Sequence, residues 1–362
     1  MRQSYNSQMP TFDYAVIGAG VFGSWLARAL VLRGRRVALI DQYGPGNTRA
    51  SSGGETRILR MGYGNKAIYT QWSWAALRHY REFDPSIFQT SGCLWLTTDP
   101  TETANTLSAN NVPHEVLDAD AINERFPQFQ IDDDTQAIFE PDAGVLLARR
   151  GVQNVVRETI KLGLDYSQTQ NPPQANTYIY ACGPWLPKIF PEILKDKIVP
   201  TRQEVLYFGT PAGDPSWRPP AMPCWIDTAG STYGIPDIED RGFKLAVDKH
   251  GPVIDPDTEH RTVTRIPRAY LESRFPALAG APLIHAEVCQ YENTATGDYL
   301  IDRHPYIPNV WLLGGGSGHG YKHGPVIGEY LAAALEDGAP IDPIFSLAAK
   351  TNYNPATRNS TI

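Results

Sequence analysis

Three glycines near the N-terminal end of the chain have the spacing of a turn that binds a pyrophosphate. They are Gly18, Gly20 and Gly23, in the run GAGVFG. In a G-x-G-x-x-G turn the first glycine permits a tight bend, the second lets the backbone approach the pyrophosphate, and the third lets a helix pack closely on a strand. A carboxylate that binds an adenosine ribose is expected about 20 residues later. Asp41 has a suitable position for this role.

The segments that flank this turn are those that it requires. Residues 13–17 (DYAVI) predict a short apolar strand, residues 24–34 predict a helix, and residues 37–40 predict a second strand. A helix that starts at the turn directs its free N–H groups and the positive end of its dipole at the phosphates. The pattern therefore predicts a dinucleotide site for NAD or FAD. The alternative is a glycine-rich turn without a ligand.

The composition excludes several classes of protein. A length of 362 residues favours two domains over a single core. With 32 Lys and Arg against 39 Asp and Glu, and without a block of basic residues, the chain does not have the charge pattern of a nucleic-acid-binding protein. The four cysteines form no C-x-x-C pair and indicate reduced thiols, and we expect Cys93, Cys182 and Cys224 to be small buried side chains. The sequence contains no recognisable signal peptide or membrane span, so we expect a cytoplasmic protein.

A Gly/Ser-rich stretch at residues 46–64 contains three arginines and, taken alone, is typical of a polar surface loop. Its run SSGGETRILRMGY, from Ser51 to Tyr63, resembles the S-x-G-[DE]-T-R-I-x-R-x-x-Y signature of the monomeric sarcosine oxidase and N-methyltryptophan oxidase family. These are flavoenzymes with a D-amino-acid-oxidase-like fold. Further matches follow in the same order, at residues 139–145, 181–185, 233–236, 242–245, 254–258, 288–291, 299–305 and 318–322. The resemblance implies FAD, rather than NAD, as the cofactor.

The resemblance also implies a mixed α/β (α+β) fold, in which a Rossmann-like FAD-binding domain is interleaved with a substrate domain built mainly on an antiparallel sheet. A strand-rich middle between the glycine turn and the glycine-rich run 314–320 agrees with one domain interrupted by another. We expect the FAD-binding domain to comprise residues 10–84, 142–195 and 298–350. The substrate domain would comprise residues 85–141 and 196–297, and residues 351–362 would form a tail.

Two cations match the family positions that hold the substrate carboxylate, Arg60 and Lys322. A planar guanidinium can bind a carboxylate through two hydrogen bonds, and an ammonium adds a point charge. Aromatic positions around the substrate are matched by three tyrosines: Tyr63, Tyr233 and Tyr291. Asp248 is a further substrate-site residue, and it stands where the family often has a histidine. This difference leaves the identity of the substrate open.

Four residues match family positions next to the flavin. Lys244 matches the lysine associated with activation of oxygen, where a cation stabilises developing superoxide, although strand alternation in GFKLAV would point it to water. Cys289 matches the cysteine that carries the flavin through a thioether to its 8α carbon, a bond whose formation needs a thiolate. Arg57 matches a cation that lies against the flavin ring. His319 matches a histidine beside the flavin, and a structural role is its alternative.

The matched motifs imply an extended set of cofactor contacts and no metal site. The expected FAD contacts are Gly18, Gly20, Val21, Phe22, Gly23, Asp41, Gln42, Ser51, Arg57, Ile58, Gly183, Cys289, Gly316, Gly318, Gly320 and Lys322. We expect the helix after the run 314–320 to start near Lys322, where its dipole can stabilise negative charge on the flavin. Between residues 156 and 178 the chain is shorter than the family's hairpin over the adenosine, so we expect a different grip on the adenosine.

The resulting prediction is an FAD-dependent oxidase of a secondary amino acid, either N-methylated or cyclic. A hydride would pass to the flavin, water would hydrolyse the imine, and O2 would be reduced to hydrogen peroxide. The expected catalytic residues are Lys244, Arg60, Lys322 and His319. The expected partners of the protein, which would be a monomer, are its amino acid substrate and O2. Three alternatives remain: a dehydrogenase of the same fold with another electron acceptor, a flavin-binding protein without turnover, and an NAD-dependent dehydrogenase.

Overall fold

The computed structural model describes residues 12–258 and 262–354 of the chain. Its N-terminal part has the predicted order of strand, glycine turn, helix and strand, as β1 (Phe12–Ile17), α1 (Val21–Leu32) and β2 (Val37–Ile40). Helix α1 starts before residue 24 because the second half of the glycine turn already has helical backbone, with Gly20 as the N-cap. Residues 10 and 11 of the expected FAD-binding domain, and residues 355–362 of the expected tail, lie outside the described residues.

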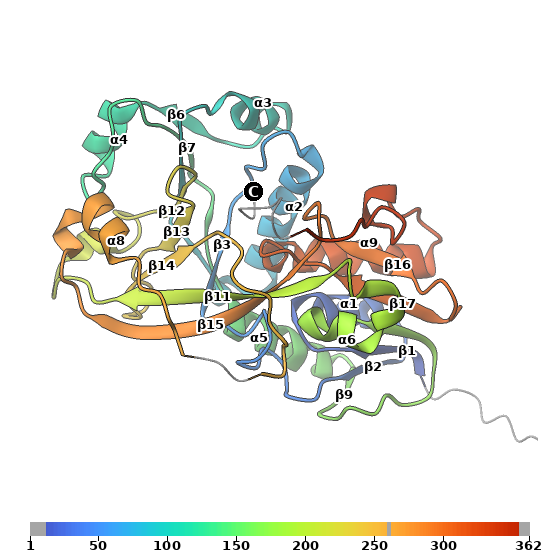
Figure 1. Ribbon diagram of the computed structural model, residues 1–362. Helices are drawn as coiled ribbons and strands as arrows, with labels where there is room; N and C mark the ends of the chain where they lie inside the picture. The colour runs from blue at the N-terminus through green and yellow to red at the C-terminus, as the bar shows by residue number, and fades with distance from the viewer. Residues whose placement is uncertain (1–11, 259–261, 355–362) are drawn as a thin grey trace, which may run out of the picture.

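A mostly parallel sheet contains the two strands of this unit (Figure 1). Its strand order is β16-β17-β10-β1-β2-β9, and all neighbours are parallel except β16 and β17. The other strands are β9 (Asp165–Ser167), β10 (Ala175–Tyr180), β16 (Leu300–Arg303) and β17 (Val310–Gly314). A parallel sheet whose first strand leads through a glycine turn into a helix is the layout of a dinucleotide-binding domain. The predicted Rossmann-like unit is therefore present.

Four helices pack around this sheet and on one another. Helix α1 contacts α5 (Ala148–Lys161) and α9 (Gly324–Glu336), and α9 also contacts α2 (Ala67–Phe83). Helix α9 starts two residues after Lys322, which lies in a 3-10 turn (Tyr321–His323), so the lysine precedes the helix instead of belonging to it. The apolar faces of these helices and the sheet share one large buried core.

A second, mainly antiparallel sheet has the order β15-β11-β14-β13-β12-β5-β7-β6, with β5 and β12 as a parallel pair. Its strands are β5 (Cys93–Thr97), β6 (Glu115–Leu117), β7 (Gln136–Glu140), β11 (Val199–Phe208), β12 (Cys224–Asp227), β13 (Thr232–Ile235), β14 (Phe243–Val247) and β15 (Leu283–Asn293). Strands β11 and β15 are long and run side by side from this sheet toward the first one (Figure 1). The fold class expected from the resemblance is confirmed by these two sheets.

A small antiparallel sheet, in the order β3-β8-β4, carries Arg57 and leads directly to Arg60. Its strands are β3 (Thr56–Leu59), β4 (Phe88–Thr90) and β8 (Gly144–Leu147). The remaining helices are α3 (Thr101–Ala109), α4 (Ala119–Arg125), α6 (Leu186–Ile189), α7 (Pro191–Leu194) and α8 (Arg268–Arg274). Further 3-10 turns span Pro85–Ile87, Gly183–Trp185, Pro215–Trp217, Pro276–Leu278 and Pro343–Phe345.

The two large sheets draw on alternating parts of the chain. The strands of the first come from residues 12–40, 165–180 and 300–314, and those of the second from residues 93–140 and 199–293. On this arrangement we propose the two interleaved domains with the boundaries expected from the sequence. Within residues 12–258 and 262–354, no helix is both long and apolar enough to cross a lipid bilayer.

Candidate active site

The glycine turn between β1 and α1 is fixed by close backbone contacts. Gly18 has a φ of +109°, and a Cβ there would lie 2.4 Å from the carbonyl oxygen of Ala181 on β10's C-terminal side. A Cβ on Gly23 would lie 2.0 Å from the carbonyl oxygen of Gly18, so this glycine packs the helix onto the turn. The Val21 amide, near the start of α1, donates to Ser52 Oγ at 3.0 Å. The close contacts at Gly18 and Gly23 leave no space for a side chain, so both positions require glycine.

The carboxylate of Asp41 lies at the end of β2, beside this turn. It accepts hydrogen bonds from the backbone amides of Ala19 (2.8 Å), Tyr43 (2.7 Å) and Gly44 (2.9 Å). Burial raises the pKa of Asp41, and these amide donors act in the opposite direction. These three hydrogen bonds hold the side chain in one orientation beside the turn.

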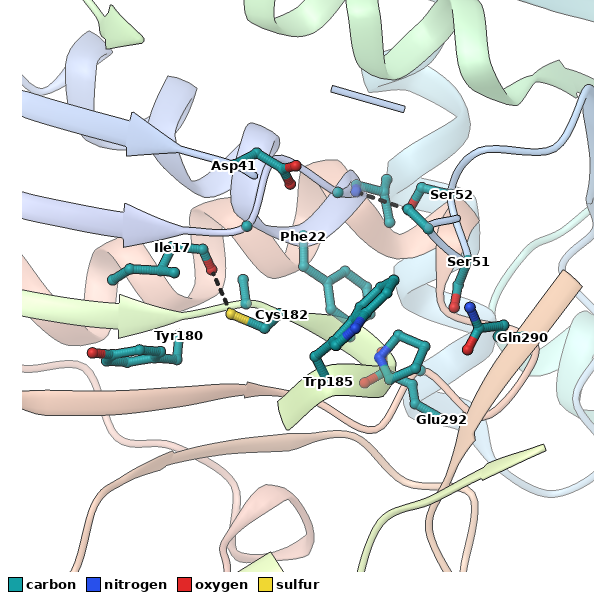
Figure 2. A pocket seen from close by; sticks show the side chains of 18 of the residues that line it. Ile17, Phe22, Asp41, Ser51, Ser52, Tyr180, Cys182, Trp185, Gln290 and Glu292 are labelled. Atoms are coloured by element: carbon teal, nitrogen blue, oxygen red, sulfur yellow. Dashed lines mark hydrogen bonds between the residues drawn. The ribbon is translucent and has the colours of Figure 1, made fainter. Parts of the chain in front are cut away.

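A cavity of about 520 Å³ adjoins the turn and contains Asp41 in its wall (Figure 2). Most of the predicted cofactor contacts line it: Gly18, Gly20, Val21, Phe22, Asp41, Gln42, Ser51, Arg57, Gly183, Gly316, Gly318 and Gly320. Four do not, because Gly23 packs inside the turn, whereas Ile58, Cys289 and Lys322 line a second, smaller cavity. The larger volume lies in the range of cofactor sites. A glycine turn, a carboxylate at the end of β2 and the cation Arg57 in one wall are the groups that an FAD molecule would need there.

Several cavity residues were not predicted from the sequence. Thr169, Gln170 and Pro172 belong to the shortened stretch 156–178, which does line the cavity although it is shorter than in the family. Trp185 lies over the cavity (Figure 2), and its Nε1 donates to Asp257 at 2.7 Å. Both residues belong to motifs that carried the family resemblance, so the motif positions were a signal. The other unpredicted lining residues include Tyr43, Asn47, Ser52, Cys182, Lys188, Gln290 and Glu292.

A second cavity of about 80 Å³ adjoins the first and shares four lining residues with it, Arg57, Tyr291, Gly318 and Tyr321. It collects every substrate residue predicted from the sequence except Tyr63: Arg60, Tyr233, Asp248, Tyr291 and Lys322. Ile58, Cys289 and His319 also line it, together with the unpredicted Gln203, Val205 and Ile226. Residues from β3, β11, β12, β13, β15 and the glycine-rich run, with Asp248 just after β14, are thus brought together by the fold.

The two predicted carboxylate-binding cations both contact Tyr63. Lys322 Nζ donates to the Tyr63 hydroxyl at 2.6 Å, and the guanidinium carbon of Arg60 lies 4.6 Å from the centroid of the Tyr63 ring. A second aromatic face, that of Trp95, lies 4.6 Å from the same guanidinium carbon. Arg60 and Lys322 are each only 5% exposed. Burial, followed by repulsion from Arg60, lowers the pKa of Lys322 well below its usual value.

A buried carboxylate, that of Glu140, accompanies these cations. It is fully buried and accepts hydrogen bonds from the backbone amides of Met61 (2.6 Å) and Gly62 (3.1 Å). Burial raises the pKa of Glu140, whereas these amides and the positive charges of Arg60 and Lys322 act to lower it. Glu140 thus fixes the backbone that follows Arg60. It belongs to the matched run 139–145, but its position there did not indicate this role.

His319 belongs to a buried hydrogen-bonded group. Its Nε2 faces the carbonyl oxygen of Gly297 at 2.9 Å, so Nε2 carries the proton and Nδ1 accepts. Nδ1 lies 2.8 Å from the Tyr299 hydroxyl and 3.3 Å from the Tyr63 hydroxyl. His323, which was not predicted, contacts the Tyr299 hydroxyl through Nδ1 and Ser73 Oγ at 2.7 Å through Nε2. Burial lowers the pKa of His323 well below its usual value.

Lys244 is buried, with 1% of its surface exposed, so the alternative that its side chain points to water is wrong. Its Nζ donates to the carbonyl oxygen of Thr56 at 2.9 Å, and it lies 5.8 Å from the centroid of the Tyr233 ring. Burial and then repulsion from Arg57 lower the pKa of Lys244 to about 7. The lysine lines neither cavity and lies behind β3, next to residues that do.

Cys289 lies beside the guanidinium of Arg57. Its Sγ lies 3.7 Å from Nη2 of Arg57 and 3.8 Å from the carbonyl oxygen of Ser51. The other three cysteines do not all have the same exposure. Cys93 and Cys224 are fully buried, as expected, on the paired strands β5 and β12. The expectation was wrong for Cys182, which is partly exposed in the wall of the larger cavity because the chain turns there toward Gly183.

Comparisons with known proteins agree with this arrangement. The family model described as FAD dependent oxidoreductase matches residues 13–334. The chain is 31% identical to monomeric sarcosine oxidase from Streptomyces avermitilis, over 92% of this chain and 96% of that protein. It is 26% identical to N-methyl-L-tryptophan oxidase from Escherichia coli, over 90% and 95% of the two chains. L-proline dehydrogenase from P. horikoshii has the same fold, with a TM-score of 0.78 and 18% identity over 94% and 98% of the two chains.

Proposed function

We propose that this chain, which belongs to the family of FAD dependent oxidoreductases, oxidises a small secondary amino acid, either N-methylated or cyclic, and passes the electrons to O2. The relatives named sarcosine oxidase and N-methyltryptophan oxidase act on CH–NH donors, and this chain is an enzyme of that class. One observation carries the proposal: two buried cations face a small cavity that shares a wall with the cofactor cavity. We also propose that the protein acts as a monomer.

The cations of the small cavity suit a carboxylate. Arg60 offers a planar fork of donors and Lys322 a point charge, and both are already held against Tyr63 before a ligand binds. Because both are nearly buried, an anion that reaches them is attracted more strongly than it would be at the protein surface. A bound amino acid is thereby fixed by its carboxylate end, so that its amine end lies toward the shared wall.

The remaining walls limit the substrate in size and charge. A volume of about 80 Å³ suits a small amino acid, and the rings of Tyr233 and Tyr291 provide apolar faces. Three basic residues, Arg57, Arg60 and Lys322, line this cavity against one acidic residue, Asp248, and this excess of positive charge disfavours an ammonium group and therefore favours the neutral amine. The neutral amine is the form that can give up a hydride. The FAD that these residues would hold supplies the hydride acceptor.

Lys244 is proposed to assist the reaction with oxygen, because a cation near reduced flavin stabilises the developing negative charge of superoxide. Its position also favours a second candidate function. Lys244 donates to the Thr56 carbonyl and lines neither cavity, which suits a structural residue. In that case the protein would be a dehydrogenase that passes electrons to a different acceptor.

Anaerobic titration of the purified protein tests the proposal. Sarcosine, L-proline and N-methyl-L-tryptophan would be added in turn while the visible absorbance of the flavin is followed. Loss of the absorbance with one of them supports an amino-acid oxidoreductase, whereas no loss with any of them favours a flavin-binding protein without turnover. The reduced protein is then mixed with oxygenated buffer. Rapid recovery of the absorbance with release of hydrogen peroxide supports an oxidase, and slow recovery supports the dehydrogenase.

We propose further that the flavin is attached to Cys289. Arg57 lies beside the sulfur, where it would favour attack of the sulfur on the 8α carbon of the flavin. The new C–S bond would replace a C–H bond of that carbon, the proton would be lost, and the two electrons would stay on the flavin until O2, the acceptor of the proposed reaction, removed them. After acid precipitation, the yellow colour should stay with the protein pellet of the wild type and move to the supernatant for Cys289→Ala. Cys224→Ala is the matched control, because this cysteine is buried away from both cavities, and its pellet should stay yellow. Colour in the wild-type supernatant contradicts the covalent bond but not FAD binding.

A further inference from the structure

Glu292 is a buried carboxyl group in the wall of the cofactor cavity. It lies near the end of β15, next to Tyr291, and only 6% of its surface is exposed. Figure 2 shows it beside Trp185 and Gln290 at one side of the cavity. Its Oε2 has no hydrogen-bond partner among residues 12–258 and 262–354. Buried polar atoms are nearly always hydrogen-bonded, so this oxygen needs a partner that the protein itself does not supply.

The carboxyl group lies against the glycine-rich run that closes the cavity. A Cβ on Gly314 would lie 3.1 Å from Glu292 Oε2, and a Cβ on Gly316 would lie 3.1 Å from Oε1. The Ser317 amide donates to the backbone carbonyl of Glu292 at 3.1 Å, which fixes β15 to this run. The side chain is therefore held on two sides by backbone, and its remaining open side is the cavity.

The charges around Glu292 do not neutralise it. In the part of the chain that the structure describes, Glu292 forms no ion pair within 4.0 Å. Burial raises the pKa of Glu292 to about 7, and the backbone amides of Gly315 and Gly316 act in the opposite direction. The ionisable groups that share its cavity wall are Asp41, Tyr43, Arg57, Tyr180, Cys182, Lys188, Asp257, Tyr291 and Tyr321, with Cys289 three residues before it on β15.

We propose that Glu292 binds the cofactor directly, as a neutral carboxylic acid that donates a hydrogen bond to an oxygen of FAD. A donor is required because the pyrophosphate makes FAD an anion, and an ionised carboxylate enclosed with it would be repelled. A neutral acid has an O–H group that can meet an acceptor oxygen. The inference rests on the binding of FAD and adds a residue that neither the motifs nor the family positions had assigned.

The proposed contact makes FAD binding depend on pH in a defined direction. Where Glu292 is ionised in the free protein, the complex must take up one proton, so the affinity falls as the pH rises above about 7. Linkage of one proton weakens the affinity by about tenfold for each pH unit above that value. A glutamine at this position keeps a donor but does not ionise. The Glu292→Gln variant should therefore bind FAD with little dependence on pH.

Reversible binding is needed for this test, so all proteins carry Cys289→Ala. FAD is titrated into the flavin-free protein at about pH 6 and about pH 8.5, and its dissociation constant is measured by calorimetry. We expect the parent to bind at least about tenfold more weakly at the higher pH, and Glu292→Gln to bind alike at both. Glu292→Ala should bind about tenfold more weakly than the parent at the lower pH, since it lacks the hydrogen bond.

Asp257→Asn is the matched control, because Asp257 is another carboxylate of the same cavity but is about half exposed and pairs with Lys188. It should retain the pH dependence of the parent. Equal pH dependence in the parent and Glu292→Gln, or unchanged affinity in Glu292→Ala, overturns the role of Glu292. If the parent itself does not bind FAD at either pH, the cofactor assignment fails and the inference fails with it. Should Glu292→Ala not fold, the glutamine variant, which has nearly the same volume, decides alone.

Discussion

Replacing Lys244 with methionine should make the folded protein more stable and, at the same time, slow the reaction of its reduced flavin with oxygen. Lys244 is buried, and burial with repulsion from Arg57 lowers its pKa from 10.5 to about 7. Methionine has a similar length and no charge, so it removes the cost of the buried ammonium. The change removes the two hydrogen bonds from Lys244 Nζ to Thr56, at 2.9 Å to its carbonyl oxygen and at 3.4 Å to its Oγ1. The Thr56 carbonyl still accepts from Arg57 Nη1 at 2.7 Å.

The expected gain in the free energy of unfolding follows from the pKa. A pKa that is lower by about 3.5 in the folded protein corresponds to about 5 kcal/mol, at about 1.4 kcal/mol for each pKa unit. Below about pH 7 the lysine is charged in both the folded and the unfolded chain, so the full cost is present. Between about pH 7 and about pH 10.5 only the unfolded chain keeps the proton, and the cost declines. The gain should thus be about 5 kcal/mol near pH 6 and about 2 kcal/mol near pH 9.

Urea unfolding of the wild type and Lys244→Met at these two pH values measures the gain. Lys249→Met is the matched control, since Lys249 is exposed near the end of the same strand, and its stability should change little at either pH. A variant that is less stable than the wild type near pH 6, or a gain that is equal at both pH values, refutes the buried-charge reasoning. Stopped-flow mixing of the reduced proteins with oxygen tests the second half of the prediction. Unchanged reoxidation in Lys244→Met would leave the lysine without a role in oxygen chemistry.

Three further changes test other parts of the site. Arg60→Lys should lower kcat/KM by about 10- to 100-fold, mainly through KM, because a lysine cannot replace the planar pair of donors. Steady-state kinetics that match the wild type would exclude a role for Arg60 in binding the substrate carboxylate. Tyr63→Phe removes the hydroxyl that accepts from Lys322 at 2.6 Å, so we expect the dissociation constant for the substrate, measured by anaerobic titration, to rise about tenfold. An unchanged dissociation constant would contradict a role for the Tyr63–Lys322 hydrogen bond in substrate binding. Gly18→Ala places a Cβ 2.4 Å from the Ala181 carbonyl oxygen, so we expect loss of bound flavin and a lower melting temperature. The control is Gly34→Ala, at a glycine with a φ of +78° and no atom within 4 Å of the added Cβ, and it should lower only the melting temperature. A yellow Gly18→Ala protein with wild-type stability would contradict the packing at Gly18.

The features that the sequence predicted well are local ones. The glycine turn, the strand before it and the helix after it lie within about 20 consecutive residues, and each glycine has a backbone reason that its neighbours reveal. Asp41 follows from the same unit, because the end of β2 lies beside the turn in any parallel pairing of the first two strands. The start of α1 was placed too late, since the apolar pattern does not show that the turn itself is helical.

Residues recognised by their motifs were brought together across long distances in the chain. Arg60 follows β3 and Lys322 precedes α9, and their common contact with Tyr63 exists only in the folded protein. The motif supplied their identity, and the fold supplied their neighbours. Gly23 and Lys244 show the converse, because both were predicted at the cofactor but lie one layer behind the cavity walls.

The amino-acid sequence by itself determined the fold class, the cofactor type and most of the residues that line the smaller cavity, because these depend on short motifs whose chemistry is carried by a few side chains. The net charge of −7 that follows from the composition does not by itself indicate that the protein binds an anionic ligand. Only the tertiary structure decided that Arg57, Arg60 and Lys322 gather around one small volume, with Lys244 buried behind it, and that Glu140 and Glu292 are buried. The protonation of such groups depends on burial and on charges from distant segments, and no local pattern in the sequence encodes either of these.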